Sequence, residues 1–322
     1  MKQILITHPI HHNTIVKLGL TEKKISRSSI NTEEIFLYIP DIGYNQFSQK
    51  HTTLDKLLYY LETFQPDILI VGSNAVPAIA ITSWRKAVGK NKNLLIIRRG
   101  VDTRAIDMKA AQQHNVLVSN LPGINSPYVA QHMIKYLDIK NAKINSKIAI
   151  IGTGNIGKQI AIKSIKYGLN PHLFSPSLQD QTKRLSTLLA RGINPAKVVC
   201  SPSVKEVIQD STYVAIAIPW LNNYGLANAG IIEEKHINNL GLNAKIVSAS
   251  VPLIFSIKAL TLMNNLAKEK KIFVRIDTSQ SRADEVREQY IHLDISHNQA
   301  FAASECQIAL DEAILDKIRA FT

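Results

Sequence analysis

Ile148-Ala-Ile-Ile-Gly-Thr-Gly-Asn-Ile-Gly-Lys158 decides the fold, because an apolar run breaks into three glycines and then resumes with helical spacing. The pattern predicts a strand, a tight turn and the start of a helix. Gly152 allows the sharp turn, Gly154 lets backbone amides approach a pyrophosphate, and Gly157 lets the helix pack closely on the strand. The stretch therefore favours the binding of a dinucleotide.

The residues after the glycines support this interpretation. A helical pattern runs from Asn155 to Tyr167, and Pro171-His-Leu-Phe174 supplies a second strand. The N–H groups at the helix start, including those of Asn155 and Ile156, are expected to contact the phosphates. The alternative is an ordinary glycine turn in an unrelated α/β domain.

Length and composition indicate a globular protein of two domains. The chain has 322 residues, more than one hydrophobic core usually organises, and 45% of them are hydrophobic. No apolar run approaches the roughly 20 residues that span a bilayer. The short apolar start, Met1 to Pro9, fits a buried strand better than a signal peptide. We therefore expect a cytoplasmic protein with no membrane segment.

Charge and cysteine content exclude some classes of partner. The net charge is +13, but Lys and Arg are spread along most of the chain, and only 6% of residues are aromatic. There is no cluster of aromatic residues for stacking on bases and no groove-reading motif, so no nucleic-acid partner is expected. Cys200 and Cys306 lack the spacing of metal ligands, and no metal site is predicted.

Short strand-like runs alternate with helical patterns almost throughout, which predicts an α/β fold of doubly wound parallel sheets. The expected strands are Gln3–Thr7, Ile68–Gly72, Leu94–Ile97, Val116–Ser119, Ile148–Ile151, His172–Phe174, Tyr213–Ala217, Ile246–Ser248 and Ile272–Ile276. Expected helices include Leu54–Thr63, Ala105–His114, Ser203–Asp210, Ser256–Lys270 and Ala300–Ala320.

The position of the glycine turn near the middle of the chain predicts a discontinuous domain arrangement. Boundary signals cluster at Pro122–Pro127 and around Ser296–Ala300. We expect a substrate domain over residues 1–125, completed by residues 294–322, and a dinucleotide-binding Rossmann domain over residues 126–293.

Two further segments are more specific than the glycines. Ile97-Arg-Arg-Gly-Val-Asp-Thr-Arg-Ala-Ile-Asp-Met-Lys-Ala-Ala111 and Val116-Leu-Val-Ser-Asn-Leu-Pro-Gly-Ile-Asn-Ser-Pro-Tyr-Val-Ala-Gln-His132 resemble the substrate-loop and hinge signature of the D-isomer-specific 2-hydroxyacid dehydrogenase family. Pro219, after one strand, and Asp277, at the end of another, match family positions that line the nicotinamide pocket.

The resemblance implies a flavodoxin-like substrate domain, a Rossmann domain and a cleft between them. It also implies hydride transfer between NAD or NADP and a small, anionic 2-hydroxy or 2-oxo acid. In the family, backbone amides of a Gly-Val loop, here Gly100 and Val101, hold the substrate carboxylate together with an arginine. We count the adjacent Arg99 as a further candidate for substrate binding.

Two catalytic positions of the family carry other residue types here. The family's carboxylate-binding arginine falls on Val251, which is apolar and cannot do that work. Counting onward from Asp277, the family's glutamate falls on Arg282. Such an arginine pushes a neighbouring histidine towards neutrality. Arg282 is also a candidate for the guanidinium that binds the substrate carboxylate in place of the missing family arginine.

The catalytic histidine of the family lies over the segment Asp294-Ile-Ser-His-Asn298. Counting without a gap gives Ser296, and a one-residue insertion gives His297, which we favour as the acid/base. The alternative is a structural or surface histidine. Asp294 or Asp277 is then the candidate carboxylate that orients His297.

Cofactor choice and assembly also depart from the family. Ser175 stands at the end of the second Rossmann strand, where an acid usually binds the ribose hydroxyls, and no adjacent arginine is available for a 2′-phosphate. NAD and NADP both remain candidates. The family's dimerisation arm is largely missing between Ala130 and Ile151, which favours a monomer or an atypical homodimer.

Two functions fit this sequence. The first is an NAD(P)-dependent oxidoreductase with a rearranged site, in which the positive charge absent at Val251 is supplied by Arg282. The second is a dinucleotide-binding sensor or interaction protein that has lost hydride chemistry.

Overall fold

The computed structural model describes residues 2–7, 35–38, 54–72, 74–222 and 225–321. Two compact units are present, residues 1–125 with 303–322 and residues 126–302. Each contains a parallel sheet with helices, so the predicted α/β class is confirmed. The chain leaves the second unit at residue 303 rather than 294, because β12 (Asp294–His297) pairs with the sheet of that unit.

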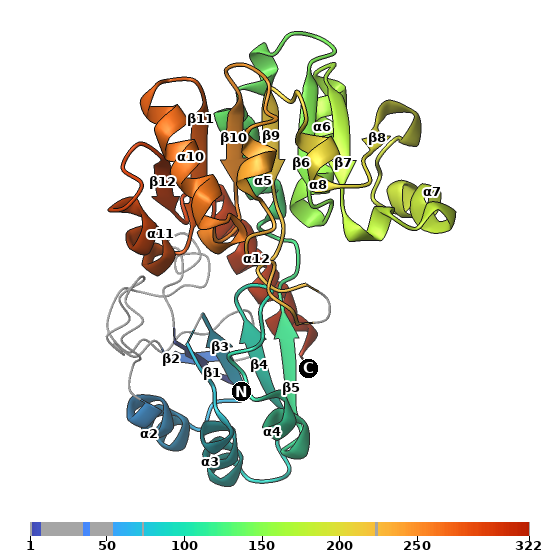
Figure 1. The fold of residues 1–322 in the computed structure, drawn as a ribbon. Helices are drawn as coiled ribbons and strands as arrows, with labels where there is room; N and C mark the ends of the chain where they lie inside the picture. The colour runs from blue at the N-terminus through green and yellow to red at the C-terminus, as the bar shows by residue number, and fades with distance from the viewer. Residues whose placement is uncertain (1, 8–34, 39–53, 73, 223–224, 322) are drawn as a thin grey trace. The chain divides into compact units, whose positions relative to one another are not determined.

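The first unit has a five-stranded parallel sheet in the order β2-β1-β3-β4-β5, the order of a flavodoxin-like fold (Figure 1). All four residues of β3 are buried, as expected for a parallel strand that is covered on both faces. The elements of this unit are β1 (Lys2–Ile6), β2 (Ile35–Tyr38), α2 (Leu54–Phe64), β3 (Ile68–Val71), α3 (Ala78–Val88), β4 (Leu94–Arg98), α4 (Met108–Gln113), β5 (Val116–Asn120) and α12 (Ser304–Ala320).

The second unit has a seven-stranded parallel sheet in the order β12-β11-β10-β9-β6-β7-β8. The strand order reverses between β6 and β9, as in a Rossmann fold. The strands are β6 (Lys147–Ile151), β7 (Asn170–Phe174), β8 (Val199–Cys200), β9 (Tyr213–Ile216), β10 (Lys245–Ser248), β11 (Phe273–Thr278) and β12.

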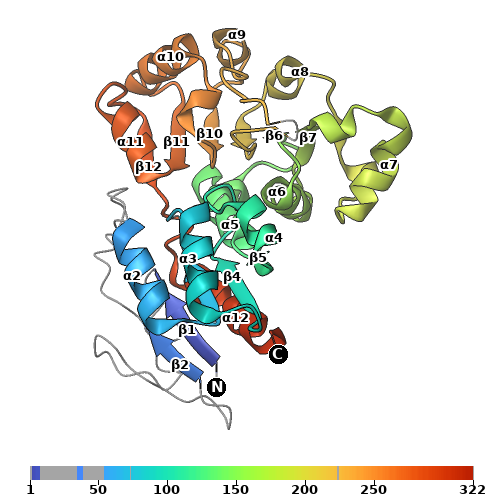
Figure 2. The same cartoon turned by 90° about the horizontal axis from the view of Figure 1, so that it is seen from below.

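Helices cover both faces of this second sheet (Figure 2). Successive residues of β6 point to opposite faces, so Ile148 and Ile150 join one core cluster while Ala149 and Ile151 join the other. Residues of α5 and α6 complete the first cluster, and residues of α8, α9 and α10 complete the second. The helices are α5 (Ser126–Leu137), α6 (Asn155–Lys166), α7 (Gln181–Ala190), α8 (Val204–Ile208), α9 (Glu234–Ile237), α10 (Ile257–Lys268) and α11 (Gln280–Arg287).

Local contacts explain where helices start later than expected. The helix predicted from Ala105 begins at Met108, because Ile106 first bridges to Val76 and Asp107 caps the helix by accepting a hydrogen bond from Ala110 N (2.8 Å). The last helix begins at Ser304 rather than Ala300.

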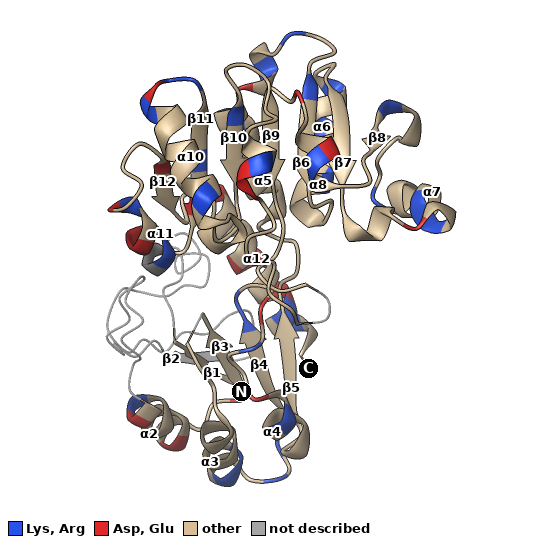
Figure 3. Ribbon diagram, viewed as in Figure 1, with Lys and Arg blue, Asp and Glu red and all other residues tan. Residues whose placement is uncertain are grey.

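Charged residues are spread over the elements of both units rather than gathered on one of them (Figure 3). None of the helices in the described ranges is long and apolar enough to cross a membrane.

Candidate functional site

The carboxyl ends of β6 and β9 mark the reversal of strand order in the seven-stranded sheet. Open α/β sheets bind ligands outside the carboxyl ends of their strands at such a reversal. The glycine turn directly follows β6 and leads into α6, so it lies at this point.

The three glycines of the turn have different surroundings. Gly152 has φ +90°, and a Cβ there would lie 2.4 Å from the carbonyl oxygen of Ala217. At Gly157 a Cβ would lie 1.8 Å from the carbonyl oxygen of Gly152. At Gly154 a Cβ would meet no heavy atom within 4 Å. Two glycines thus allow close packing, whereas the middle one borders open space.

The start of α6 has unsatisfied donors beside that open space. The N-cap, Gly154, has no side chain, and the first turn contains no acidic residue. Lys158 N is the first to find a backbone acceptor, the carbonyl oxygen of Gly154 (3.0 Å). The N–H groups of Asn155, Ile156 and Gly157 have no acceptor among the residues that the structure describes. Such donors, together with the helix dipole, favour an anion.

Hydroxyl groups and an arginine surround the end of β7. Ser175 is buried, and its Oγ lies 3.0 Å from Ser177 Oγ. Arg191, the C-cap of α7, donates from Nη1 to Thr153 Oγ1 (2.5 Å) and from Nη2 to Ser177 Oγ (2.8 Å). The sequence places no arginine adjacent to Ser175, but the fold brings the distant Arg191 to Ser177, which contacts Ser175.

The loop after β9 is held in place by Ser250. Its Oγ donates to the carbonyl oxygen of Ile218 (2.7 Å) and accepts from Ile218 N (3.1 Å). Asn228 Nδ2 donates to the carbonyl oxygen of Pro219 (2.8 Å). Val251, next in the chain, packs against a buried apolar cluster instead of presenting a charge.

Asp277, the second-to-last residue of β11, fixes the loop that follows β12. Its Oδ1 accepts from Ser296 Oγ (2.7 Å) and Gln299 N (3.0 Å), and its Oδ2 accepts from Ala300 N (3.1 Å). Ser296 is buried, so its hydroxyl serves this structural contact. His297 ends β12, opposite Thr278 of β11, at the same edge of the sheet as the glycine turn.

Asp294 lies at the wrong end of β12 to act on His297. It is the first residue of the strand and three positions away, which corresponds to about 10 Å along the strand. Its carboxylate pairs with Arg275, a buried residue of β11. Asp294 is thus paired with Arg275 away from His297, whereas Asp277 lies near the carboxyl end of β11.

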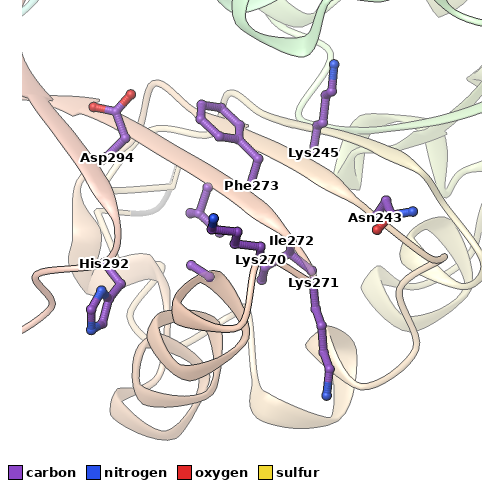
Figure 4. Close-up of a pocket in the computed structure, with 10 residues that line it drawn as sticks. Asn243, Lys245, Lys270, Lys271, Ile272, Phe273, His292 and Asp294 are labelled. Atoms are coloured by element: carbon purple, nitrogen blue, oxygen red, sulfur yellow. The ribbon is translucent and has the colours of Figure 1, made fainter.

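Asp294 also lines a pocket at the starting ends of β10, β11 and β12 (Figure 4). This edge is opposite to the edge that carries the glycine turn, so the pocket is separate from the candidate site. The lining residues are Asn243, Lys245, Ala267, Lys270, Lys271, Ile272, Phe273, Val274, His292 and Asp294.

Arg282 lies on α11 and forms an ion pair with Glu285 (Nη1 to Oε2, 2.8 Å). The two side chains are 41% and 54% exposed, so the pair contributes at most about 1 kcal/mol. The guanidinium of Arg282 can therefore exchange this partner for a ligand carboxylate at low cost.

His132 of α5 was assigned no role from the sequence beyond its place in the hinge signature. Its ring lies 4.7 Å from that of Tyr136, and Arg275 Cζ lies 3.5 Å from the centre of the Tyr136 ring. Its Nε2 is buried without a partner in the described part of the chain. Burial lowers the pKa of His132, and the charge of Asp277 opposes that shift. Only the three-dimensional contact with β11 shows this environment.

The predicted substrate loop belongs to the first unit. Arg99 is buried, and its Nη2 lies 2.6 Å from Oδ1 of Asp311, which is also buried. This ion pair holds α12 against the loop, which gives the Arg99 side chain a structural role. Gly100 N donates to the carbonyl oxygen of Arg98 (2.9 Å), whereas the N–H of Val101 has no acceptor in the described ranges. Val101 is 54% exposed.

Comparison with known proteins agrees with this architecture. Residues 147–237 match the family described as NADP oxidoreductase, coenzyme F420-dependent. The chain is 24% identical over 149 residues to D-3-phosphoglycerate dehydrogenase of Bacillus subtilis, which covers 39% of this chain and 26% of that protein. It is 24% identical over 179 residues to hydroxypyruvate reductase of Thermotoga maritima, covering 48% and 53% respectively. The chain thus spans a quarter to about half of the length of these relatives.

Solved structures match over nearly the whole chain. A protein from Polaromonas sp. JS6 66, described as a D-isomer-specific 2-hydroxyacid dehydrogenase, has a TM-score of 0.70 and 15% identity, covering 99% of this chain and 96% of that one. NAD+-bound 3-phosphoglycerate dehydrogenase of Entamoeba histolytica has a TM-score of 0.63 and 17% identity, covering 99% and 95%. The curated relatives and these neighbours confirm the resemblance to D-2-hydroxyacid dehydrogenases, and at these identities the structures establish the fold.

Proposed function

We propose that this chain binds a nicotinamide dinucleotide at the carboxyl edge of its seven-stranded sheet and uses it to interconvert a small anionic 2-hydroxy acid and the corresponding 2-oxo acid. The observation that carries the proposal is the open space at Gly154 in front of the unsatisfied N–H groups of Asn155 and Ile156. A diphosphate fits there, because it would satisfy these donors and the positive end of α6 without meeting a side chain.

The chain's own residues can be assigned roles in this reaction. A bound nicotinamide would donate or accept the hydride. His297 Nε2 or Nδ1 would exchange the proton of the substrate hydroxyl, since an imidazole nitrogen can both accept and donate a proton. Asp277 is a positioning residue, because it fixes the loop that follows His297. Arg282 would bind the substrate carboxylate.

The relatives support the class of reaction. The curated relatives are dehydrogenases or reductases of small acids, and one structural neighbour carries NAD+. The two cysteines of the chain, Cys200 and Cys306, are both free thiols, which fits the proposed cytoplasmic location. We propose a monomer or an atypical homodimer, which sedimentation equilibrium distinguishes.

Steady-state reduction of a panel of 2-oxo acids tests this function. Replacing Arg282 with leucine removes the candidate carboxylate fork, and we expect KM for the acid to rise about 10-fold or more while dinucleotide affinity stays unchanged. Arg319→Leu is the matched control, because Arg319 also forms an exposed i,i+3 ion pair, with Asp316. Equal kinetics for both variants would remove Arg282 from the site.

A second candidate is a dinucleotide-binding sensor or interaction protein without hydride transfer. The packing of Val251 in the apolar cluster favours it, since the usual cation is replaced by a core contact. Tight dinucleotide binding with no turnover of any acid in the panel would select this function. Val251→Arg then becomes informative, because recovered activity would indicate that only the carboxylate-binding group is missing.

A further inference from the structure

Arg191 joins two segments that are distant in sequence. Its guanidinium contacts Thr153 within the glycine turn and Ser177 just after β7, and Ser177 in turn contacts Ser175. In a Rossmann fold, the end of the second strand faces the 2′ position of the adenosine ribose, and β7 is the second strand of this unit. The cluster therefore lies where NAD and NADP differ.

The hydrogen bonds of the cluster leave donors available for an anion. A guanidinium has five N–H donors, and the structure uses two of those of Arg191. The other three have no acceptor among the described residues. Thr153 Oγ1 accepts from Arg191 and keeps its own hydrogen to donate elsewhere. The bond between Ser175 Oγ and Ser177 Oγ uses one of their two hydroxyl hydrogens and leaves the other for a ligand.

No carboxylate in the described ranges neutralises Arg191. The usual acid at the end of the second strand is replaced by Ser175. Asp180, the nearest acid along the chain, caps α7 instead: its Oδ1 accepts from Thr182 N (3.0 Å) and Thr182 Oγ1 (2.6 Å), and its Oδ2 lies 3.7 Å from Lys183 Nζ. Burial also lowers the pKa of Arg191, so its charge is partly desolvated without an acidic partner.

We infer that Arg191, Ser175, Ser177 and Thr153 form a binding site for the 2′-phosphate, and that the chain selects NADP(H) over NAD(H). The inference rests on the proposed function, because the diphosphate must first be held at the glycine turn. A bound 2′-phosphate would accept hydrogen bonds from the charged, forked guanidinium of Arg191 and from up to two hydroxyl groups. An aspartate at position 175 would instead repel the phosphate and accept the ribose hydroxyls.

The test measures dissociation constants of the full chain for NADPH, NADH, adenosine 2′,5′-bisphosphate and ADP by calorimetry. We expect NADPH to bind about 10- to 150-fold more tightly than NADH, the range of a charge-assisted hydrogen bond. Arg191→Met should raise the dissociation constants of NADPH and the bisphosphate by a similar factor, while those of NADH and ADP should change by no more than about twofold. Lys183→Met, on the exposed part of the same helix, is the control.

Two further variants complete the design. Ser175→Asp should favour NADH over NADPH, and Arg191→Lys should lose part of the NADPH affinity because it keeps the charge but not the fork. Equal affinity of the unmodified chain for NADPH and NADH overturns the inference and leaves the proposed function intact. Equal loss of both dinucleotides in Arg191→Met also overturns it, since Arg191 would then only support the turn through Thr153. If the chain binds none of the four ligands, both the inference and the proposed function are overturned.

Discussion

Replacing Gly154 with alanine separates binding from folding. Gly154 has φ −66° and ψ −160°, an extended conformation that alanine adopts readily. The added methyl group would meet no protein atom within 4 Å. We therefore expect the free energy of unfolding to stay the same or rise by about 0.4–1 kcal/mol, because alanine has less conformational freedom than glycine in the unfolded chain.

The same methyl group should obstruct the ligand. It would occupy the open space in front of the α6 amides, so a diphosphate could no longer approach them closely. Loss of one charge-assisted hydrogen bond costs about 1.5–3 kcal/mol, which corresponds to a roughly 10- to 150-fold weaker affinity.

Gly157→Ala is the matched control with the opposite effect on folding. Its Cβ would lie 1.8 Å from the carbonyl oxygen of Gly152, whereas non-bonded contacts of carbon lie near 3.5 Å. Helix α6 would have to move away from β6, and overpacking of this kind costs about 1–3 kcal/mol or more. We expect Gly157→Ala to lower the free energy of unfolding by at least that amount.

Urea unfolding followed by circular dichroism measures stability, and calorimetric titration with NADPH measures affinity in the same preparations. The reasoning is refuted if Gly154→Ala binds NADPH like the unmodified chain. It is also refuted if the Gly154 and Gly157 variants are destabilised equally, since the glycine turn would then not have the packing described above.

Three other perturbations probe the rest of the structure. Asp311→Asn leaves buried Arg99 without its carboxylate and should cost about 3–5 kcal/mol in urea unfolding, whereas Asp316→Asn, in an exposed pair, should cost under about 1 kcal/mol; similar losses would contradict a structural role for the buried pair. Burial lowers the pKa of His236 in the folded chain below its ordinary value of 6.5, so the unfolded chain binds more protons just below pH 6.5. The contribution of His236 to the free energy of unfolding is therefore fully present above about pH 6.5 and should fall on acidification. Because His236 Nδ1 accepts from Glu233 N (2.9 Å), His236→Gln keeps an acceptor and should reduce this pH dependence. If the free energy of unfolding of this variant depends on pH between about 7 and 5 as that of the unmodified chain does, His236 is not the source of the pH dependence.

The strands at the centre of each sheet were predictable because they are continuous apolar runs that both faces of a parallel sheet require. The strands absent from the sequence-based expectation, β2, β8 and β12, all lie at sheet edges. β8 has only two residues, and β12 reads Asp-Ile-Ser-His, with a single apolar side chain. Hydrophobic patterning therefore gives little signal for β8 and β12, whereas β2 reads Ile-Phe-Leu-Tyr, an apolar run that is absent from the expected strands.

The candidate site shows the same limit. The strand, turn and helix around Gly152 and Gly157 were predictable, because local conformation demands those glycines. The contact of Arg191 with Thr153 was not, since it joins residues 38 apart in the chain through the packing of α7. The ion pair of Arg99 with Asp311 spans 212 positions, so nothing in the sequence indicates that the Arg99 side chain has a structural partner.

Calorimetric titration of the intact chain with NADPH tests the central claim most directly. We expect a single saturable site with a dissociation constant below about 1 mM, the upper end of ordinary cofactor and substrate affinities, and competition by ADP. Absence of binding by NADPH, NADH and ADP at millimolar concentration would contradict the assignment of the α6 N-terminus and its glycine turn as a dinucleotide site.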